Sequence, residues 1–190
     1  SVWGSGEAST CVRPRTLTRV VHKAPTWTAY ELVLDVFQGT HSYGYLNLPN
    51  DLKPGDRRPV VFCQHGGGGN PRMVTVGDNP TYRGFAGKLA ERGFITYAPL
   101  SLYADAIVRR CNVIGKTQYS VIAAQYQQVI RWLKPLPSVH PDRIGLYGLR
   151  RGGQTALRPP ILGHDFSLTV CAGKVTEWRA PTASSRDAVR

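Results

Sequence analysis

The sequence is short of acidic residues and contains no long hydrophobic run. Its 190 residues hold 24 Lys and Arg but only 12 Asp and Glu, which gives a formal net charge of +12. No run of about 18 apolar residues is present, so the sequence predicts no membrane-spanning helix. The basic residues are scattered, without a stripe along a helix and without interleaved aromatic residues. This pattern favours a solvated, Arg-rich surface and argues against a nucleic-acid partner.

Cysteine is also scarce, and its spacing excludes the common metal-binding patterns. The four cysteines are Cys11, Cys63, Cys111 and Cys171, and none belongs to a C-x-x-C pair. Cys63 and Cys171 lie within apolar runs, which is typical of small core residues. A disulfide between Cys11 and Cys111 is left open by the sequence.

The length and the 42% hydrophobic content are typical of one globular domain. Residues 1–29 show no clear periodicity, so we expect an irregular lead-in there. The small, polar residues 179–190 predict a frayed tail, which leaves a domain over 30–178. At its start, alternating apolar residues predict a β-hairpin over 30–48 that turns at Gly39 and Thr40.

Short buried strands alternate with helices through the rest of this domain. Strands are predicted at 60–64, 94–99, 143–148 and 166–173. Helices are predicted at 82–93, between Ser120 and Pro135, and at 151–157, and the segment around Arg109 and Arg110 is predicted to be a loop. The alternation indicates an α/β fold with a mostly parallel sheet and flanking helices. Such sheets carry their sites at the carboxyl ends of the strands.

Two glycine-rich loops follow predicted strands and are the candidates for chemistry. The first is HGGGG at 65–69, where glycines let backbone N–H groups approach a ligand closely. The second is YGLRRGG at 147–153, which has the frame G-x-S-x-G of a sharp strand-to-helix turn. In this frame Arg150 stands where a hydrolase carries its serine.

These loops, together with RRPVVFCQHGGGG, FAGKLAERGFITYAP and LTVCAGKVTEW, resemble the α/β-hydrolase superfamily over residues 30–178. The acetyl-xylan-esterase and dienelactone-hydrolase-like group is the most similar. The resemblance implies acyl transfer on a small-molecule ester or acyl substrate, without a metal or organic cofactor. It also implies site roles: Arg150 takes the nucleophile position, Gly66, Gly67 and Arg151 supply the oxyanion hole, and His65 and Glu177 border the substrate.

Two departures from that family predict an inactive relative. A guanidinium has five donors, no acceptor and a permanent charge, so Arg150 cannot replace a serine nucleophile. The only later histidine is His164, and it precedes the strand at 166–173 on the wrong edge of the sheet to act as the base. We therefore expect a truncated domain.

The reason for these departures is left open. An incomplete record, an inactive relative, a decayed gene and a single base change from a Ser codon would each produce one or both of them. The alternative to a hydrolase lineage without turnover is a non-catalytic module that binds anionic ligands at Arg150.

Overall fold

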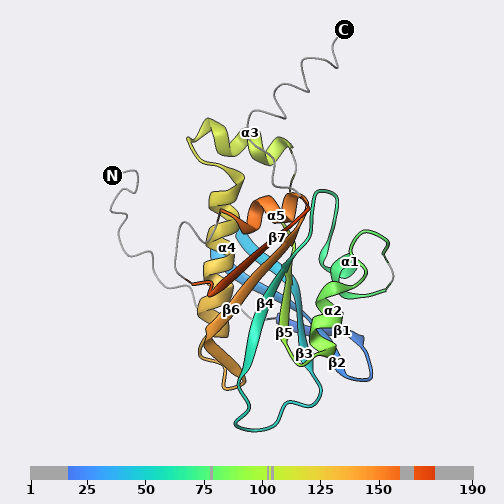
Figure 1. Cartoon of the computed structure of the whole chain (residues 1–190). Helices are drawn as coiled ribbons and strands as arrows, with labels where there is room; N and C mark the ends of the chain where they lie inside the picture. The colour runs from blue at the N-terminus through green and yellow to red at the C-terminus, as the bar shows by residue number, and fades with distance from the viewer. Residues whose placement is uncertain (1–16, 78, 102, 104, 159–164, 174–190) are drawn as a thin grey trace.

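The computed structural model describes residues 17–77, 79–101, 103, 105–158 and 165–173. In this part of the chain one seven-stranded sheet has the order β1-β2-β3-β5-β4-β6-β7 (Figure 1). Its strands are β1 (Leu17–Lys23), β2 (Trp27–Phe37), β3 (Thr40–Pro49), β4 (Arg58–Gln64), β5 (Ile95–Pro99), β6 (Val139–Leu149) and β7 (Leu168–Ala172). The helices are α1 (Pro71–Thr75), α2 (Phe85–Glu91), α3 (Asp105–Val113), α4 (Gln118–Leu133) and α5 (Arg151–Ala156).

The sheet is mixed. β5, β4, β6 and β7 are parallel neighbours, whereas β1, β2 and β3 pair antiparallel and β3 pairs antiparallel with β5. The carboxyl ends of β4 and β6 therefore meet at one edge of the sheet, which places the two glycine-rich loops side by side.

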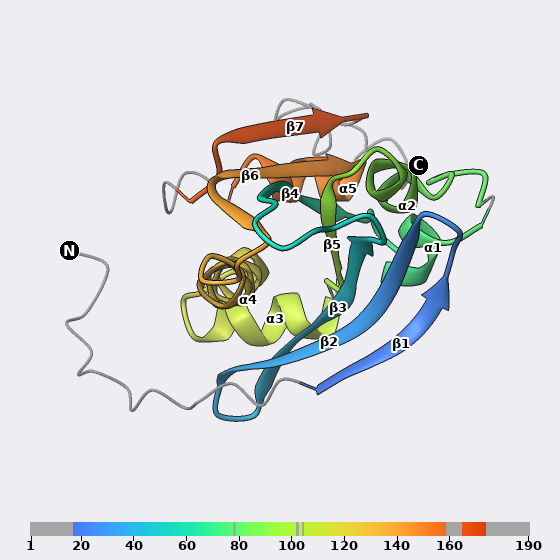
Figure 2. The same ribbon diagram turned by 90° about the horizontal axis from the view of Figure 1, so that it is seen from below.

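Helices cover both faces of the sheet, with α2 on one face and α4 on the other (Figure 2). Because successive side chains of a strand point to opposite faces, β4 contributes to both cores. Phe62 packs with Tyr126 and Ile130 of α4, while its neighbour Cys63 packs with Ala86 of α2. None of the helices in the described ranges has the length and apolarity that a membrane crossing requires.

Two predictions about local structure are corrected by the strands and helices observed. Residues 17–29 belong largely to β1 and β2 and are not irregular; β1 is an outer strand, and Arg19 on it pairs with Glu31 of β2 over 2.7 Å. An outer strand needs little alternation of apolar and polar residues, so the sequence pattern of β1 only weakly indicates a strand. The predicted loop around Arg109 and Arg110 is helix α3, which projects beyond the carboxyl edge of the sheet (Figure 1).

Candidate functional site

The turn between β6 and α5 is made by Arg150 alone. β6 ends at Leu149, α5 begins at Arg151, and Arg150 between them has φ 57° and ψ −119°. A positive φ is costly for a residue with a Cβ, so surrounding contacts must hold it. The Arg150 N–H donates to the Ala172 carbonyl over 2.8 Å, and the Arg150 carbonyl accepts from the Gln154 N–H over 3.2 Å. The backbone of this turn is thus bonded to β7 on one side and to α5 on the other.

Glycines around the turn are required by close approach of backbone to backbone. A Cβ on Gly152 would lie 2.5 Å from both the Gln64 and the His65 carbonyl oxygens, and a Cβ on Gly148 would overlap the Gly152 carbonyl. A Cβ on Gly153 would lie 2.8 Å from Cys171 Sγ. A Cβ at any of these three positions of the strand-to-helix turn would therefore force neighbouring atoms to move.

The HGGGG loop lies directly against this turn. A Cβ on Gly66 would be 3.1 Å from the Leu149 carbonyl and 3.3 Å from Arg150 Cβ, and one on Gly67 would be 3.7 Å from Arg151 Cδ. The Gly66 N–H donates to the Tyr82 hydroxyl over 3.0 Å, so it is already engaged. The N–H groups of Gly67 and Arg151 have no hydrogen-bond acceptor within the described ranges.

His65 supports this loop from inside the protein. The side chain is fully buried, and Nε2 accepts the Ser101 N–H over 3.1 Å. Nδ1 must then carry the proton, which it donates to the Gly66 carbonyl over 2.7 Å. Burial lowers the pKa of His65 and keeps the ring neutral. Both ring nitrogens are thus used by the backbone, and the expectation that His65 borders the substrate stays a prediction.

A buried polar network, not foreseen in the sequence, lies beneath the two loops. Gln64 Oε1 accepts from the hydroxyls of Ser101, over 3.0 Å, and Tyr126, and Gln64 Nε2 donates to the His65 carbonyl over 2.9 Å. Tyr103 shares a 2.7 Å hydrogen bond with the Thr155 hydroxyl of α5.

Burial raises the pKa of Tyr103 and of Tyr126 above the usual range, so both remain neutral hydroxyls. Tyr126 lies on the apolar face of α4 by its helical spacing, and Tyr103 follows β5 without any motif. Neither position therefore carries a sequence signal for a polar role.

Two arginine residues lie next to each other at the site. The Arg150 side chain is exposed, and it makes no ion pair or hydrogen bond with the residues that the structure describes. The Arg151 guanidinium carbon lies 5.0 Å from the centre of the Tyr103 ring, and its Nη1 donates to the Tyr103 carbonyl over 3.4 Å. A fixed positive charge is thus presented at the apex of the turn.

Three residues singled out in the sequence cannot be placed relative to this site. Glu177 and His164 lie outside the described residues, as does Cys11. In the described part of the chain no group of three His, Cys, Asp or Glu side chains is arranged to hold a metal ion.

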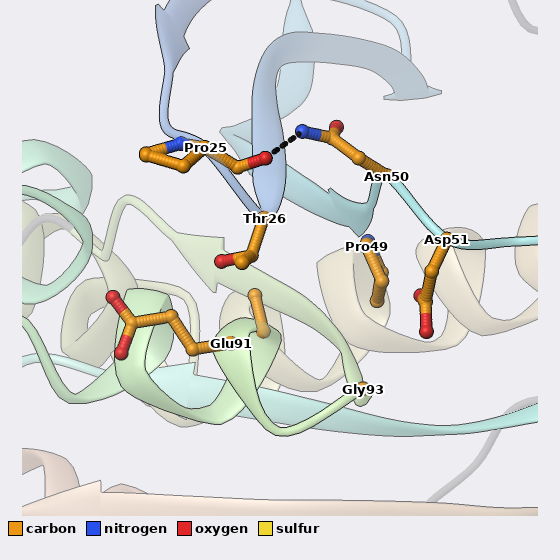
Figure 3. Close-up of a pocket in the computed structure, with 8 residues that line it drawn as sticks. Pro25, Thr26, Pro49, Asn50, Asp51, Glu91 and Gly93 are labelled. Carbon is orange, nitrogen blue, oxygen red and sulfur yellow. Dashed lines mark hydrogen bonds between the residues drawn. The ribbon is translucent and has the colours of Figure 1, made fainter.

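A hollow of about 330 Å³ with a mixed polar and apolar lining lies at the opposite end of the sheet, where β3 ends and β5 begins (Figure 3). Asn50 at its rim donates to the Pro25 carbonyl over 3.2 Å, and Asp51 pairs with Arg58 over 3.4 Å. These groups serve the local fold, and the hollow is remote from the turn at Arg150.

Comparison with solved structures shows which fold this is. No protein-family model matches the chain. The chain is similar to a candidate acetyl xylan esterase from Bacteroides fragilis (TM-score 0.69, 16% identity, 80% of this chain and 46% of that one). It is also similar to acetyl xylan esterases from Paenibacillus sp. (TM-score 0.62, 19% identity, 84% and 52%) and Thermoanaerobacterium sp. (TM-score 0.58, 17% identity, 77% and 48%).

The likeness establishes an α/β-hydrolase-like fold of the kind found in esterases. The chain spans about half the length of these three structures. At such identities the comparison supports the fold, while activity and substrate have to be argued from the site itself.

Proposed function

We propose that this chain is an α/β-hydrolase-fold protein of carboxylic-ester hydrolase, acetyl-esterase-like lineage that does not turn over esters. One observation carries the proposal: Arg150 occupies the apex of the turn between β6 and α5, with φ 57° and ψ −119°, against the HGGGG loop. In hydrolases with this kind of turn the apex residue is the one presented to the substrate carbonyl.

Arginine at the apex removes the nucleophile that acyl transfer requires but leaves the neighbouring N–H donors in place. Acyl transfer begins when a hydroxyl gives its proton to a base and its oxygen attacks the carbonyl carbon. The guanidinium has no lone pair to give and stays charged, so no acyl intermediate forms on Arg150. The N–H groups of Gly67 and Arg151 would still donate hydrogen bonds to a carbonyl oxygen placed between them. Removal of a nucleophile typically lowers the rate constant by about 10⁶-fold.

The direct test is hydrolysis of p-nitrophenyl acetate by the whole chain. We expect the rate to equal that of Arg150→Ala, and a serine-directed phosphonate to leave both unchanged. A rate well above that of buffer, abolished by the phosphonate, would show that another serine acts as the nucleophile and would refute the proposal.

The second candidate function is binding of small anions, above all carboxylates, at Arg150. The observation that favours it is the exposed Arg150 side chain without an acidic partner in the described residues, next to the charge of Arg151. A guanidinium can hold a carboxylate through two parallel N–H bonds. The ligand would be held without being cleaved.

This candidate is tested by the melting temperature in millimolar benzoate. We expect benzoate to raise the melting temperature of the native chain and of Arg143→Gln, which removes an exposed arginine from β6 outside the turn. Arg150→Gln should abolish the increase. Equal responses of the native chain and Arg150→Gln would exclude a ligand at this side chain.

A further inference from the structure

An apolar hollow of about 300 Å³ lies at the end of the sheet opposite to Arg150. Buried side chains from β3, β5, α4 and β6 form its floor, among them Leu46 and Leu133. Its walls are half-buried side chains of β2, β3, α4 and the segment after α4, namely Tyr30, Leu48, Trp132 and Leu136. The hollow is therefore open to solvent, and its floor belongs to the hydrophobic core between the sheet and α4.

The sequence explains why the protein does not fill this space itself. α4 ends at Leu133, and Pro135 and Pro137 follow immediately, which prevents another helical turn. The Lys134 ammonium is held by Asp165 over 2.9 Å. The helix thus ends beside the hollow, and the half-buried side chains of Tyr30 and Leu48 line it together with Leu133.

The lining selects an uncharged ligand. Among the residues that the structure describes, no charged side chain lines the hollow. The polar side-chain groups in its lining are the hydroxyls of Tyr30 and Ser138 and the indole N–H of Trp132. Neither hydroxyl is hydrogen-bonded to another residue in the described ranges. A charged ligand would lose its hydration here without gaining an ionic partner, which is strongly unfavourable.

The volume sets the size of the ligand. A closed cavity of about 150 Å³ holds one benzene ring, and small-molecule sites begin at about 300 Å³. We propose that this hollow binds an uncharged, mostly apolar small molecule of about two-ring size that carries a single hydroxyl or carbonyl group. Its apolar part packs on Leu46, Leu48 and Leu136, and its polar group meets Tyr30 or Ser138.

The position makes this a second site and not a part of the first. The hollow lies at the amino ends of β5 and β6, whereas Arg150 follows the carboxyl end of β6. A ligand here would join the end of α4 to β2 and β3, and would stabilise the folded chain by binding it and not the unfolded chain. The proposal does not depend on whether Arg150 binds anions.

The test compares two probes that differ in charge. The whole chain is titrated with 2-naphthol and with 2-naphthalenesulfonate, which has the same ring system and a permanent negative charge. By calorimetry we expect saturable binding of 2-naphthol. In Arg150→Gln, where the sulfonate has no guanidinium to bind at the apex of the turn, we expect affinity for the sulfonate lower by at least about tenfold. Equal affinity of Arg150→Gln for the two probes, or no saturable binding of 2-naphthol, would overturn the proposal.

Variants then place the ligand. Leu52→Trp, at a half-buried position of the lining in the loop before β4, fills the hollow with an apolar ring and should weaken 2-naphthol binding at least about tenfold. Leu136→Glu should do the same by adding a charge to the wall. Ile114→Glu, a control at a 70% exposed position far from the hollow, should bind as the native chain does. Native affinity in Leu52→Trp would refute the site even if Leu136→Glu does not fold.

Discussion

The backbone N–H of Ser101 donates a hydrogen bond to Nε2 of His65 over 3.1 Å, and this contact decides the state of the histidine. Because an amide can only donate, Nε2 accepts and the proton resides on Nδ1, facing the Gly66 carbonyl. The ring thereby joins the end of β5 to the glycine-rich loop. A charged imidazolium would have to abandon the bond from Ser101.

Folding stability should therefore decline in mild acid through His65. Burial lowers the pKa of His65 below its usual 6.5, so the unfolded chain binds more protons below that pH than the folded chain. The unfolding free energy falls as pH drops below about 6.5, by at most about 1.4 kcal/mol per pH unit, and levels off below the folded-state pKa. Urea denaturation between pH 7.5 and 5 measures this, and His65→Gln should show a flatter profile. Parallel profiles would contradict the assignment.

Glycine is needed at 152 but not at 67. Gly152→Ala places a Cβ 2.5 Å from two backbone carbonyl oxygens and should lower the unfolding free energy by roughly 3 kcal/mol. Gly67→Ala, the matched control, meets nothing closer than 3.7 Å and should change it by less than about 1 kcal/mol. Chemical denaturation of the two variants checks the pair, and similar losses would argue against the close packing of β4 on the turn.

The left-handed backbone at the apex should make Arg150→Gly stabilising. A non-glycine residue at φ 57° costs about 1 kcal/mol or more, and glycine removes that cost. Arg143→Gly, the same exchange at an exposed position of β6, should instead lower the unfolding free energy by about 0.5–1 kcal/mol. Loss of stability in both variants would mean that the Arg150 side chain contributes packing that offsets its strain.

The Tyr82 hydroxyl should contribute to the unfolding free energy through its hydrogen bond with the Gly66 N–H. Tyr82→Phe leaves the buried Gly66 N–H without an acceptor and should cost about 1–3 kcal/mol of unfolding free energy. Tyr147→Phe is the control, because that ring packs on Phe85 and its hydroxyl is bonded to no described residue. We expect its effect to stay within about 0.5 kcal/mol. A neutral Tyr82→Phe would place the Gly66 N–H in contact with water.

β7 should promote association of the chain. It pairs with β6 alone among the described strands, and Leu168 and Val170 on it are 63% and 40% exposed. Leu168→Lys should lower light scattering after incubation roughly twofold, because a charge on an edge strand opposes pairing. Val113→Lys, at an 86% exposed position on α3, removes equal apolar character away from the edge and should help less. Equal effects would indicate general apolar association.

The parallel part of the fold could be predicted because its signals are local. The run from Val60 to Cys63 is apolar and short, and the structure has β4 there. The spacing of Ile122, Tyr126 and Val129 is helical, and the structure has α4 there. β1 and α3 were not predicted because both lie at the periphery of the fold. Few of their side chains are packed there, so their sequences show no regular apolar pattern. Arg109 and Arg110 can lie in α3 because this helix makes few contacts with the sheet, so their charged side chains need not be buried.

The backbone conformation of the candidate site could be predicted from the sequence, whereas the side chains that hold its two loops in place could not. The glycines at 148, 152 and 153 predict close packing of backbone at the turn, and a Cβ on any of them would force neighbouring atoms to move. The roles of Tyr82 and Ser101 depend on contacts across 16 and 36 residues of chain, which no local pattern encodes. The N–H of Gly66 was expected to face a ligand, but only the fold brings Tyr82 to it.

The bond from the Arg150 N–H to the Ala172 carbonyl has a consequence for synthesis of the chain. A domain generally folds as a unit during synthesis, and β4, β5 and β6 all precede the turn in the chain. The turn cannot take its described shape until residue 172 is available and β7 has paired with β6. Completion of this turn, and with it of the fold unit, therefore depends on a residue that is synthesised 22 positions after the apex.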